Sequence, residues 1–396
     1  AYRFLPKAFI AAMDVMNQLL GTRLEVVEHY RTKDADMVIV VIGSGVGVVK
    51  DVVDYYRDVK GWKVGITRPV LFTPPCYEEI AQGVRGTKAV TVLERAAIAH
   101  NQPLLRDVQV ALQLSPPENG QMPAVFHGVY GLGSKDFNKH DAAAVIENMK
   151  THLDGEQDRS LQEFYVGIEG PYTLKPVELP GYEEQELGMT FVGVGAEGVK
   201  TALETAGHIY AQDTGEGAKH IQSGARYGAA RKGAAVFMNL RISDGSIRNS
   251  SELTERDVLA FFNDKFLVDD VLREYVGGLK EGGLFVINST RPASELLASF
   301  SEYVQTLIRD RQIRLVAFDA TRAALAHLDR NLPGAALLGL INKGVGILPE
   351  EVFEGKFKQI IGAKLAKKGG SAIVDSNVAL LRHGSGQTVS EAGGDR

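Results

Sequence analysis

Cysteine is nearly absent from this sequence: Cys76 is the only one among 396 residues. A single thiol cannot form a disulfide within the chain, and it cannot supply the four thiolates that hold an iron–sulfur cluster. Because Cys76 directly follows Pro74 and Pro75, we interpret it as a core or loop residue rather than a catalytic thiol. The sequence also contains no His-x-x-x-His or Cys-x-x-Cys pair, which argues against a dedicated metal site.

An excess of positive charge and a long apolar run are also missing. The formal net charge of −5 argues against a protein that binds nucleic acid through phosphate contacts. No apolar run approaches the roughly 20 residues that span a bilayer. The N-terminus lacks the basic-then-apolar layout of a secretory signal, so we expect a cytoplasmic protein without a membrane span. The sequence begins at Ala1 and not at a methionine, which leaves processing or omitted upstream residues open.

The most informative stretch of the sequence covers residues 189–203. An apolar run there meets a turn with Gly193, Gly195 and Gly198, and small apolar residues follow at helical spacing. This pattern predicts a strand, a tight turn and a helix. Gly193 and Gly195 would let the backbone turn sharply and approach a bound group, and Gly198 would let the helix pack on the strand. The free amides at the start of the helix would then attract an anion, most often a phosphate.

The same glycine spacing is equally compatible with an ordinary strand–helix turn. In a classical NAD site, an acidic residue about 20 positions later binds the ribose. The candidates for that role are Asp213 and Glu216. Both lie in a glycine-rich loop with no clear strand before it, which disfavours a classical NAD site.

Strands and helices alternate along the rest of the chain, which is 44% hydrophobic and long enough for two or three domains. Residues 4–20 predict an amphipathic helix that ends at Gly21. The β-branched run at 37–42 is typical of a buried parallel strand. Further strands are predicted at 63–66, 88–93, 123–126, 164–168, 233–240, 284–288 and 315–319, and late helices at 335–340 and 356–367. The alternation predicts an α/β protein with parallel sheets and right-handed crossovers.

These elements divide the chain into five parts. We predict a helical N-terminal segment, a first α/β domain, a linker rich in Glu, Gln, Asp, Pro and Gly, a second α/β domain and a loose tail of Gly, Ser and charged residues. In the same order, their bounds are 1–30, 31–150, 151–188, 189–384 and 385–396.

Several motifs resemble, in order along the chain, one family of enzymes. Residues 34–58, 63–75 and 128–137 resemble the second domain of pyruvate:ferredoxin oxidoreductases, and the third of these motifs is the most specific. Residues 165–168 fit the linker of that family, and the glycine turn fits the start of its γ domain. The remaining segments that fit the γ domain are 231–233, 239–241, 280–283, 287–289, 318–320 and 346–349. The resemblance covers nearly the whole chain.

This resemblance implies a transketolase C-terminal-like parallel-sheet domain followed by a γ-type α/β domain. It also implies oxidative decarboxylation of a 2-oxoacid on thiamine diphosphate, acyl transfer to coenzyme A, and electron transfer through 4Fe-4S clusters to ferredoxin. The family's domains for thiamine diphosphate and for the clusters have no counterpart in this sequence. We therefore expect thiamine-binding and iron–sulfur partner subunits, with ferredoxin or a similar electron carrier reached through the complex.

Within such an enzyme, the γ-type domain is the better candidate for engaging coenzyme A. Backbone amides around Gly193, Gly195 and Gly198 would receive its pyrophosphate. The cations that could meet its 3′-phosphate are Lys200, Arg226, Lys232 and Arg248. Separate γ subunits of the family usually read Gly-x-Gly-Gly-Gln-Gly at this turn, whereas this chain has Ala196 and Glu197, and a carboxylate beside an anion pocket repels phosphate. We assign no catalytic residue and no metal ligand to this chain.

Two other functions stay open at this point. A non-catalytic paralogue would hold a larger redox assembly together without binding a cofactor. An independent nucleotide-binding protein would bind NAD or ATP by itself. The glycine-rich segment 131–136 would suit a phosphate loop, although we favour a packing turn between domains. Arg241, Arg248 and Arg291 are interpreted as surface or interface arginines rather than as ligand clamps.

Overall fold

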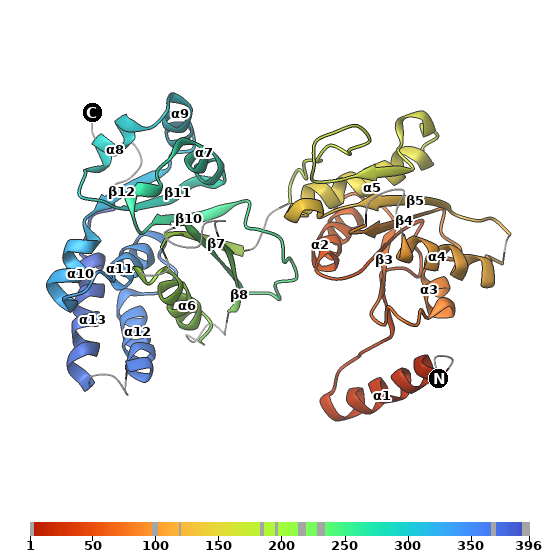
Figure 1. The fold of residues 1–396 in the computed structure, drawn as a ribbon, viewed down its shortest axis with the longest axis horizontal. Helices are drawn as coiled ribbons and strands as arrows, with labels where there is room; N and C mark the ends of the chain where they lie inside the picture. The colour runs from red at the N-terminus through yellow and green to blue at the C-terminus, as the bar shows by residue number, and fades with distance from the viewer. Residues whose placement is uncertain are drawn as a thin grey trace. The chain divides into compact units, whose positions relative to one another are not determined.

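The structure is a computed structural model that describes most of the chain. The described residues are 4–96, 102–118, 120–182, 186–194, 197–212, 219–227, 234–365 and 370–389. Backbone contacts divide the chain into two compact units, residues 1–183 with 248–251 and residues 184–247 with 252–396. Each unit is built on its own six-stranded sheet (Figure 1). The predicted α/β class is confirmed.

The sheet of the first unit has the strand order β1-β3-β2-β4-β5-β6. Its strands are β1 (Val27–Tyr30), β2 (Met37–Val41), β3 (Val64–Pro69), β4 (Ala89–Glu94), β5 (Ala124–Val129) and β6 (Glu163–Tyr165). β1 runs antiparallel to β3, and the other neighbours are parallel. Every residue of β2 is buried, as its β-branched sequence predicts for a central strand covered on both faces.

Helices cover both faces of this first sheet. The helices of the unit are α1 (Leu5–Leu20), α2 (Gly45–Asp58), α3 (Tyr77–Val84), α4 (Pro103–Leu114) and α5 (Lys139–Leu153), with short 3-10 turns at Leu132–Ser134 and Gln157–Arg159. α2 and α5 pack on one face, and α3 and α4 pack on the other. α1 ends at Gly21 as predicted, because Gly21 adopts a left-handed backbone with φ 65°.

The sheet of the second unit has the strand order β12-β11-β10-β7-β9-β8. Its strands are β7 (Glu186–Gly193), β8 (His220–Tyr227), β9 (Val236–Ser243), β10 (Arg256–Phe261), β11 (Leu279–Asn288) and β12 (Arg314–Phe318). β7, β10, β11 and β12 are parallel, and β9 runs antiparallel to both β7 and β8. The carboxyl ends of β7, β10 and β11 therefore meet at one edge of this sheet.

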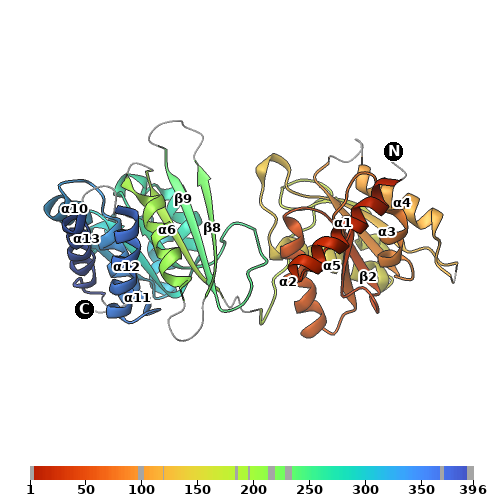
Figure 2. The same cartoon turned by 90° about the horizontal axis from the view of Figure 1, so that it is seen from below.

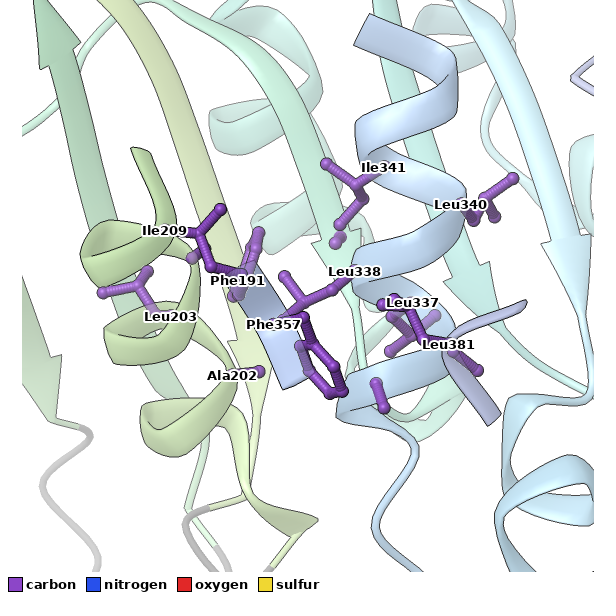
Figure 3. Packing of buried hydrophobic residues seen from close by; sticks show 14 of the residues in the cluster. Phe191, Ala202, Leu203, Ile209, Leu337, Leu338, Leu340, Ile341, Phe357 and Leu381 are labelled. Carbon is purple, nitrogen blue, oxygen red and sulfur yellow. The ribbon is translucent and has the colours of Figure 1, made fainter. Parts of the chain in front are cut away.

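Two groups of helices enclose the second sheet. Its helices are α6 (Val199–Tyr210), α7 (Asp269–Gly277), α8 (Ala293–Ser299), α9 (Glu302–Asp310), α10 (Ala320–Leu328), α11 (Gly334–Val345), α12 (Glu350–Leu365) and α13 (Gly370–Ser385), with a 3-10 turn at Asp264–Phe266. α6 and α10–α13 pack on one face, which Figure 2 shows, and α7–α9 pack on the other (Figure 1). On the first face, Phe191 of β7 lies among Ile209 of α6, Leu338 of α11 and Phe357 of α12 (Figure 3).

The structure differs from the sequence prediction in several elements. Within the predicted linker 151–188, the strand predicted at 164–168 is observed as β6 with the bounds Glu163–Tyr165, and it pairs with β5 in the first sheet. The sequence prediction named neither strands β1, β8 and β10 nor helices α3–α5, α7–α10 and α13. Among the described residues, no helix has both the length and the apolar character needed to cross a bilayer.

Candidate functional site

The candidate site is the edge of the second sheet at which β7, β10 and β11 end. Gly193 closes β7, Asn263 follows β10, and Ser289 follows β11. Because these parallel strands are neighbours, the loops after them lie side by side. The carboxyl edge of an open α/β sheet is where such folds place their ligands. The predicted Gly193 turn is therefore positioned as a binding turn would be.

Gly193 and Gly198 serve the turn in different ways. A Cβ on Gly193 would lie 2.6 Å from Cγ2 of Val199 and 2.8 Å from Cβ of Phe262. Gly198 has a left-handed backbone with φ 78°, and a Cβ there would meet only Leu332, at 3.4 Å. The close approach of helix to strand, which we predicted for Gly198, is thus provided by Gly193, whereas Gly198 provides the backbone conformation that starts α6.

The side chain of Glu197 folds back into the turn. The backbone N–H of Val194 donates to Oε2 of Glu197 at 3.2 Å, and the amide of Asn263 donates to Oε1 at 2.7 Å. The N–H of Glu197 donates to the carbonyl oxygen of Val194 at 3.0 Å. The carboxylate therefore occupies the position in which the backbone N–H of Val194 would meet an anion.

Polar side chains also join the two loops next to this turn. Oγ of Ser289 donates to Oδ2 of Asp264 at 2.7 Å. The amide of Asn288 donates to the carbonyl oxygen of Phe262 at 2.9 Å, and its Oδ1 accepts the N–H of Thr321 at 3.1 Å. Asn263 and Asp264 were not predicted as site residues. The sequence feature that could have identified them is that they are two polar residues directly after the apolar run 258–262.

Two of the predicted cations belong to the second unit. Lys200 is exposed in the first turn of α6, with Nζ 3.8 Å from the carboxylate of Glu204. Arg226 lies on β8, where its guanidinium pairs with Glu252 at 3.3 Å and Glu274 at 3.1 Å and stacks 5.1 Å above the ring of Phe237. Phe237 belongs to the core on the α7–α9 face, so Arg226 lies on the opposite face of the sheet from α6.

Arg248 belongs instead to the first unit. Its Nε donates to Oδ1 of Asp51 and its Nη2 to Oδ2 of Asp54, both at 2.8 Å, and its Nη1 donates to the hydroxyl of Tyr30 at 3.1 Å. Burial alone would lower the pKa of Arg248, but the bonds to Asp54 and Tyr30 raise it above its usual value. The predicted residues Gly195 and Lys232 lie outside the described residues. Of the predicted set, the structure brings together Gly193, Gly198 and Lys200.

Cys76 is a buried residue at the start of α3, with an exposed fraction of 3%. Burial raises the pKa of its thiol to about 11, so the thiol stays protonated at neutral pH. In the parts of the chain that the structure describes, no group of three or more His, Cys, Asp or Glu side chains is arranged to hold a metal ion.

Two families of known proteins match this sequence. Residues 188–387, which span half of the chain, match the family described as pyruvate ferredoxin/flavodoxin oxidoreductase. The chain belongs to this family. Residues 35–142 match core domain II of pyruvate:ferredoxin oxidoreductase. The resemblance seen in the sequence motifs is confirmed.

The similar proteins are considerably longer than this chain. A pyruvate dehydrogenase (NADP(+)) of Cryptosporidium parvum is 27% identical over 387 residues, which are 95% of this chain and 19% of that protein. A putative pyruvate-flavodoxin oxidoreductase of Synechocystis is 26% identical over 388 residues, which are 96% of this chain and 31% of that protein. Among solved structures, a pyruvate oxidoreductase subunit of Thermotoga maritima is 22% identical, with a TM-score of 0.40, over 51% of this chain and 96% of that one.

Proposed function

We propose that this chain is a subunit of a pyruvate-type 2-oxoacid:ferredoxin oxidoreductase and supplies its central and γ-type domains. The complex converts a 2-oxoacid to acyl-CoA by oxidative decarboxylation and passes the electrons to ferredoxin or a similar carrier. The observation that carries this proposal is the order of the two family matches, with core domain II at 35–142 followed by the longer match at 188–387.

In this proposal, thiamine diphosphate and the 4Fe-4S clusters belong to partner chains. Support comes from the cysteine content, because a cluster takes about four thiolates and this sequence has one cysteine. That cysteine, Cys76, is buried at the start of α3 and keeps its proton, so it is a poor ligand even for a shared cluster.

The described residues of the Gly193 turn do not fit the pyrophosphate of coenzyme A as they stand. The carboxylate of Glu197 already accepts the N–H of Val194 and the amide of Asn263. Arg226 is committed to carboxylates on the other face of the sheet. We therefore derive no step of acyl transfer through this turn.

This poor fit favours a second candidate function, a non-catalytic paralogue that holds a larger redox assembly together. Such a protein keeps both folded units and needs no free anion site. Both candidates share the dependence on partner chains, and they differ in whether the assembled complex oxidises a 2-oxoacid.

One purification experiment tests the proposal. The tagged chain is purified from its native cells, and the proteins that accompany it are identified by mass spectrometry. We expect thiamine-binding and iron–sulfur subunits, a brown complex, and reduction of a viologen dye that requires both pyruvate and coenzyme A. A complex with those partners but without the activity would support the paralogue, and purification of the chain without any such partner would contradict both. The chain produced alone is expected to be colourless.

A further inference from the structure

The geometry points to Glu197 as an internal carboxylate that closes the Gly193 turn and keeps phosphate groups out of it. Glu197 has this role in the turn whichever of the two candidate functions the chain performs. Its side chain accounts for the poor fit of the turn to a pyrophosphate.

One oxygen of the Glu197 carboxylate binds the backbone at the start of the turn. Oε2 of Glu197 accepts the N–H of Val194 at 3.2 Å, immediately after the end of β7. A phosphate oxygen seeking the same N–H would have to lie where Oε2 lies. Because both groups are negative, the second anion is repelled as well as displaced.

The other carboxylate oxygen is anchored by Asn263. Oε1 of Glu197 accepts the amide of Asn263 at 2.7 Å. Asn263 is itself fixed, because its Oδ1 accepts the N–H of Lys265 at 3.0 Å and caps the 3-10 turn Asp264–Phe266. The amide nitrogen of Asn263 is thereby directed at Glu197. The carboxylate links the loop after β7 to the loop after β10.

The groups that bind the carboxylate of Glu197 carry no positive charge. Both donors to Glu197 are neutral groups, a backbone N–H and a side-chain amide. In the described part of the chain, no Lys, Arg or His forms an ion pair with Glu197; Lys200, in the first turn of α6, lies 3.8 Å from the carboxylate of Glu204. Among the described residues, Glu197 is therefore held by neutral donors and not by an ion pair, so its carboxylate adds a negative charge to the turn that an incoming phosphate would approach.

The test is calorimetric titration of the full chain with inorganic pyrophosphate. The variants are Glu197→Gln and Glu197→Ala, and the matched controls are Glu204→Gln and Glu204→Ala, which remove the same charge from an exposed position on α6, the helix that follows the turn. We expect Glu197→Ala to bind pyrophosphate at least tenfold more tightly than the natural chain, and the Glu204 variants to match the natural chain.

A further variant keeps the experiment decisive if Glu197→Ala does not fold. Asn263→Ala retains the carboxylate but removes its anchor, so it is expected to bind pyrophosphate with an affinity between those of the natural chain and Glu197→Gln. Circular dichroism establishes which variants are folded. Equal pyrophosphate affinity in the natural chain and in the folded Glu197 variants, or no binding by any of them, would overturn the inference. None of these outcomes depends on which partner chains accompany the protein.

Discussion

Within the first unit, the carbonyl oxygen of Arg248 lies 1.7 Å from the position that a Cβ on Gly47 would take. The two residues are far apart in the sequence, yet the segment 248–251 packs directly on α2. Asp51 and Asp54 lie four and seven residues after Gly47, on the same face of the helix, and both accept hydrogen bonds from Arg248. Gly47 therefore makes room for a segment that two carboxylates then hold.

The first prediction concerns Gly47→Ala. The added methyl group would displace the backbone of Arg248 and weaken its ion pairs, so we expect a loss of about 1–3 kcal/mol in the free energy of unfolding. Gly355→Ala in α12 is the control, because a Cβ there meets nothing within 4 Å. This control is expected to gain up to about 1 kcal/mol from helix propensity. Urea unfolding measures both, and equal stability of the two variants would refute the prediction.

The second prediction concerns the acid sensitivity of the Arg248 segment. Burial alone would raise the pKa of Asp54, but hydrogen bonds from Arg248, Arg31 and Tyr30 lower it below its usual value. A carboxyl group with a lowered folded-state pKa stabilises the protein at neutral pH, and this stability is lost as the pH falls through about 4 towards the folded-state pKa.

Arg248→Gln is therefore expected to be less stable than the natural chain near pH 7 and to lose less stability on acidification. We expect the difference to be about 1 kcal/mol or less, because the ion pairs are partly exposed. Urea unfolding between pH 7 and pH 3.5 measures it. The control Arg291→Gln removes a guanidinium that lies 3.8 Å from Asp264 and is expected to leave the pH profile unchanged. Parallel profiles for Arg248→Gln and the natural chain would contradict the prediction.

The third prediction concerns the steric role of Gly193. In Gly193→Ala, the new methyl group would overlap Val199 and Phe262, so we expect a loss of about 1–3 kcal/mol in the free energy of unfolding. Gly224→Ala in β8 is the matched control, since a Cβ at that position meets nothing within 4 Å. Thermal and urea unfolding measure both variants. If Gly193→Ala is as stable as Gly224→Ala, then α6 does not depend on close approach at this glycine.

Local sequence patterns predicted the elements that depend on neighbouring residues. The β-branched run of β2 and the terminal Gly21 of α1 were both readable, because strand burial and helix termination are set within a few positions. The bond between Glu197 and Asn263 joins residues 66 positions apart. It exists because β10 pairs with β7, and strand order is not encoded in either loop. The contact of Arg248 with α2 could not be predicted from local sequence either, because it depends on the chain topology.

The histidine of β5, His127, is buried in the first unit. His127 has an exposed fraction of 2%, and its Nδ1 lies 3.2 Å from the amide nitrogen of Gln102. Its Nε2 has no hydrogen-bond partner in the part of the chain that the structure describes. Burial lowers the pKa of His127, although the nearby Glu163 opposes this effect. The neutral ring is therefore the form that the folded protein accommodates.

The fourth prediction follows from the sign of that shift. The unfolded chain takes up a proton at its ordinary pKa of about 6.5, before the folded protein does, so acidification below that pH favours unfolding. We expect His127→Leu to reduce the stability lost between pH 7.5 and pH 5 by about 1 kcal/mol, because the group that the unfolded state protonates is gone. His220→Leu, which removes an exposed histidine from β8, is expected to keep the natural pH profile. Urea unfolding across this pH range compares the three proteins. If His127→Leu loses as much stability on acidification as the other two, protonation of the buried ring does not contribute to acid unfolding.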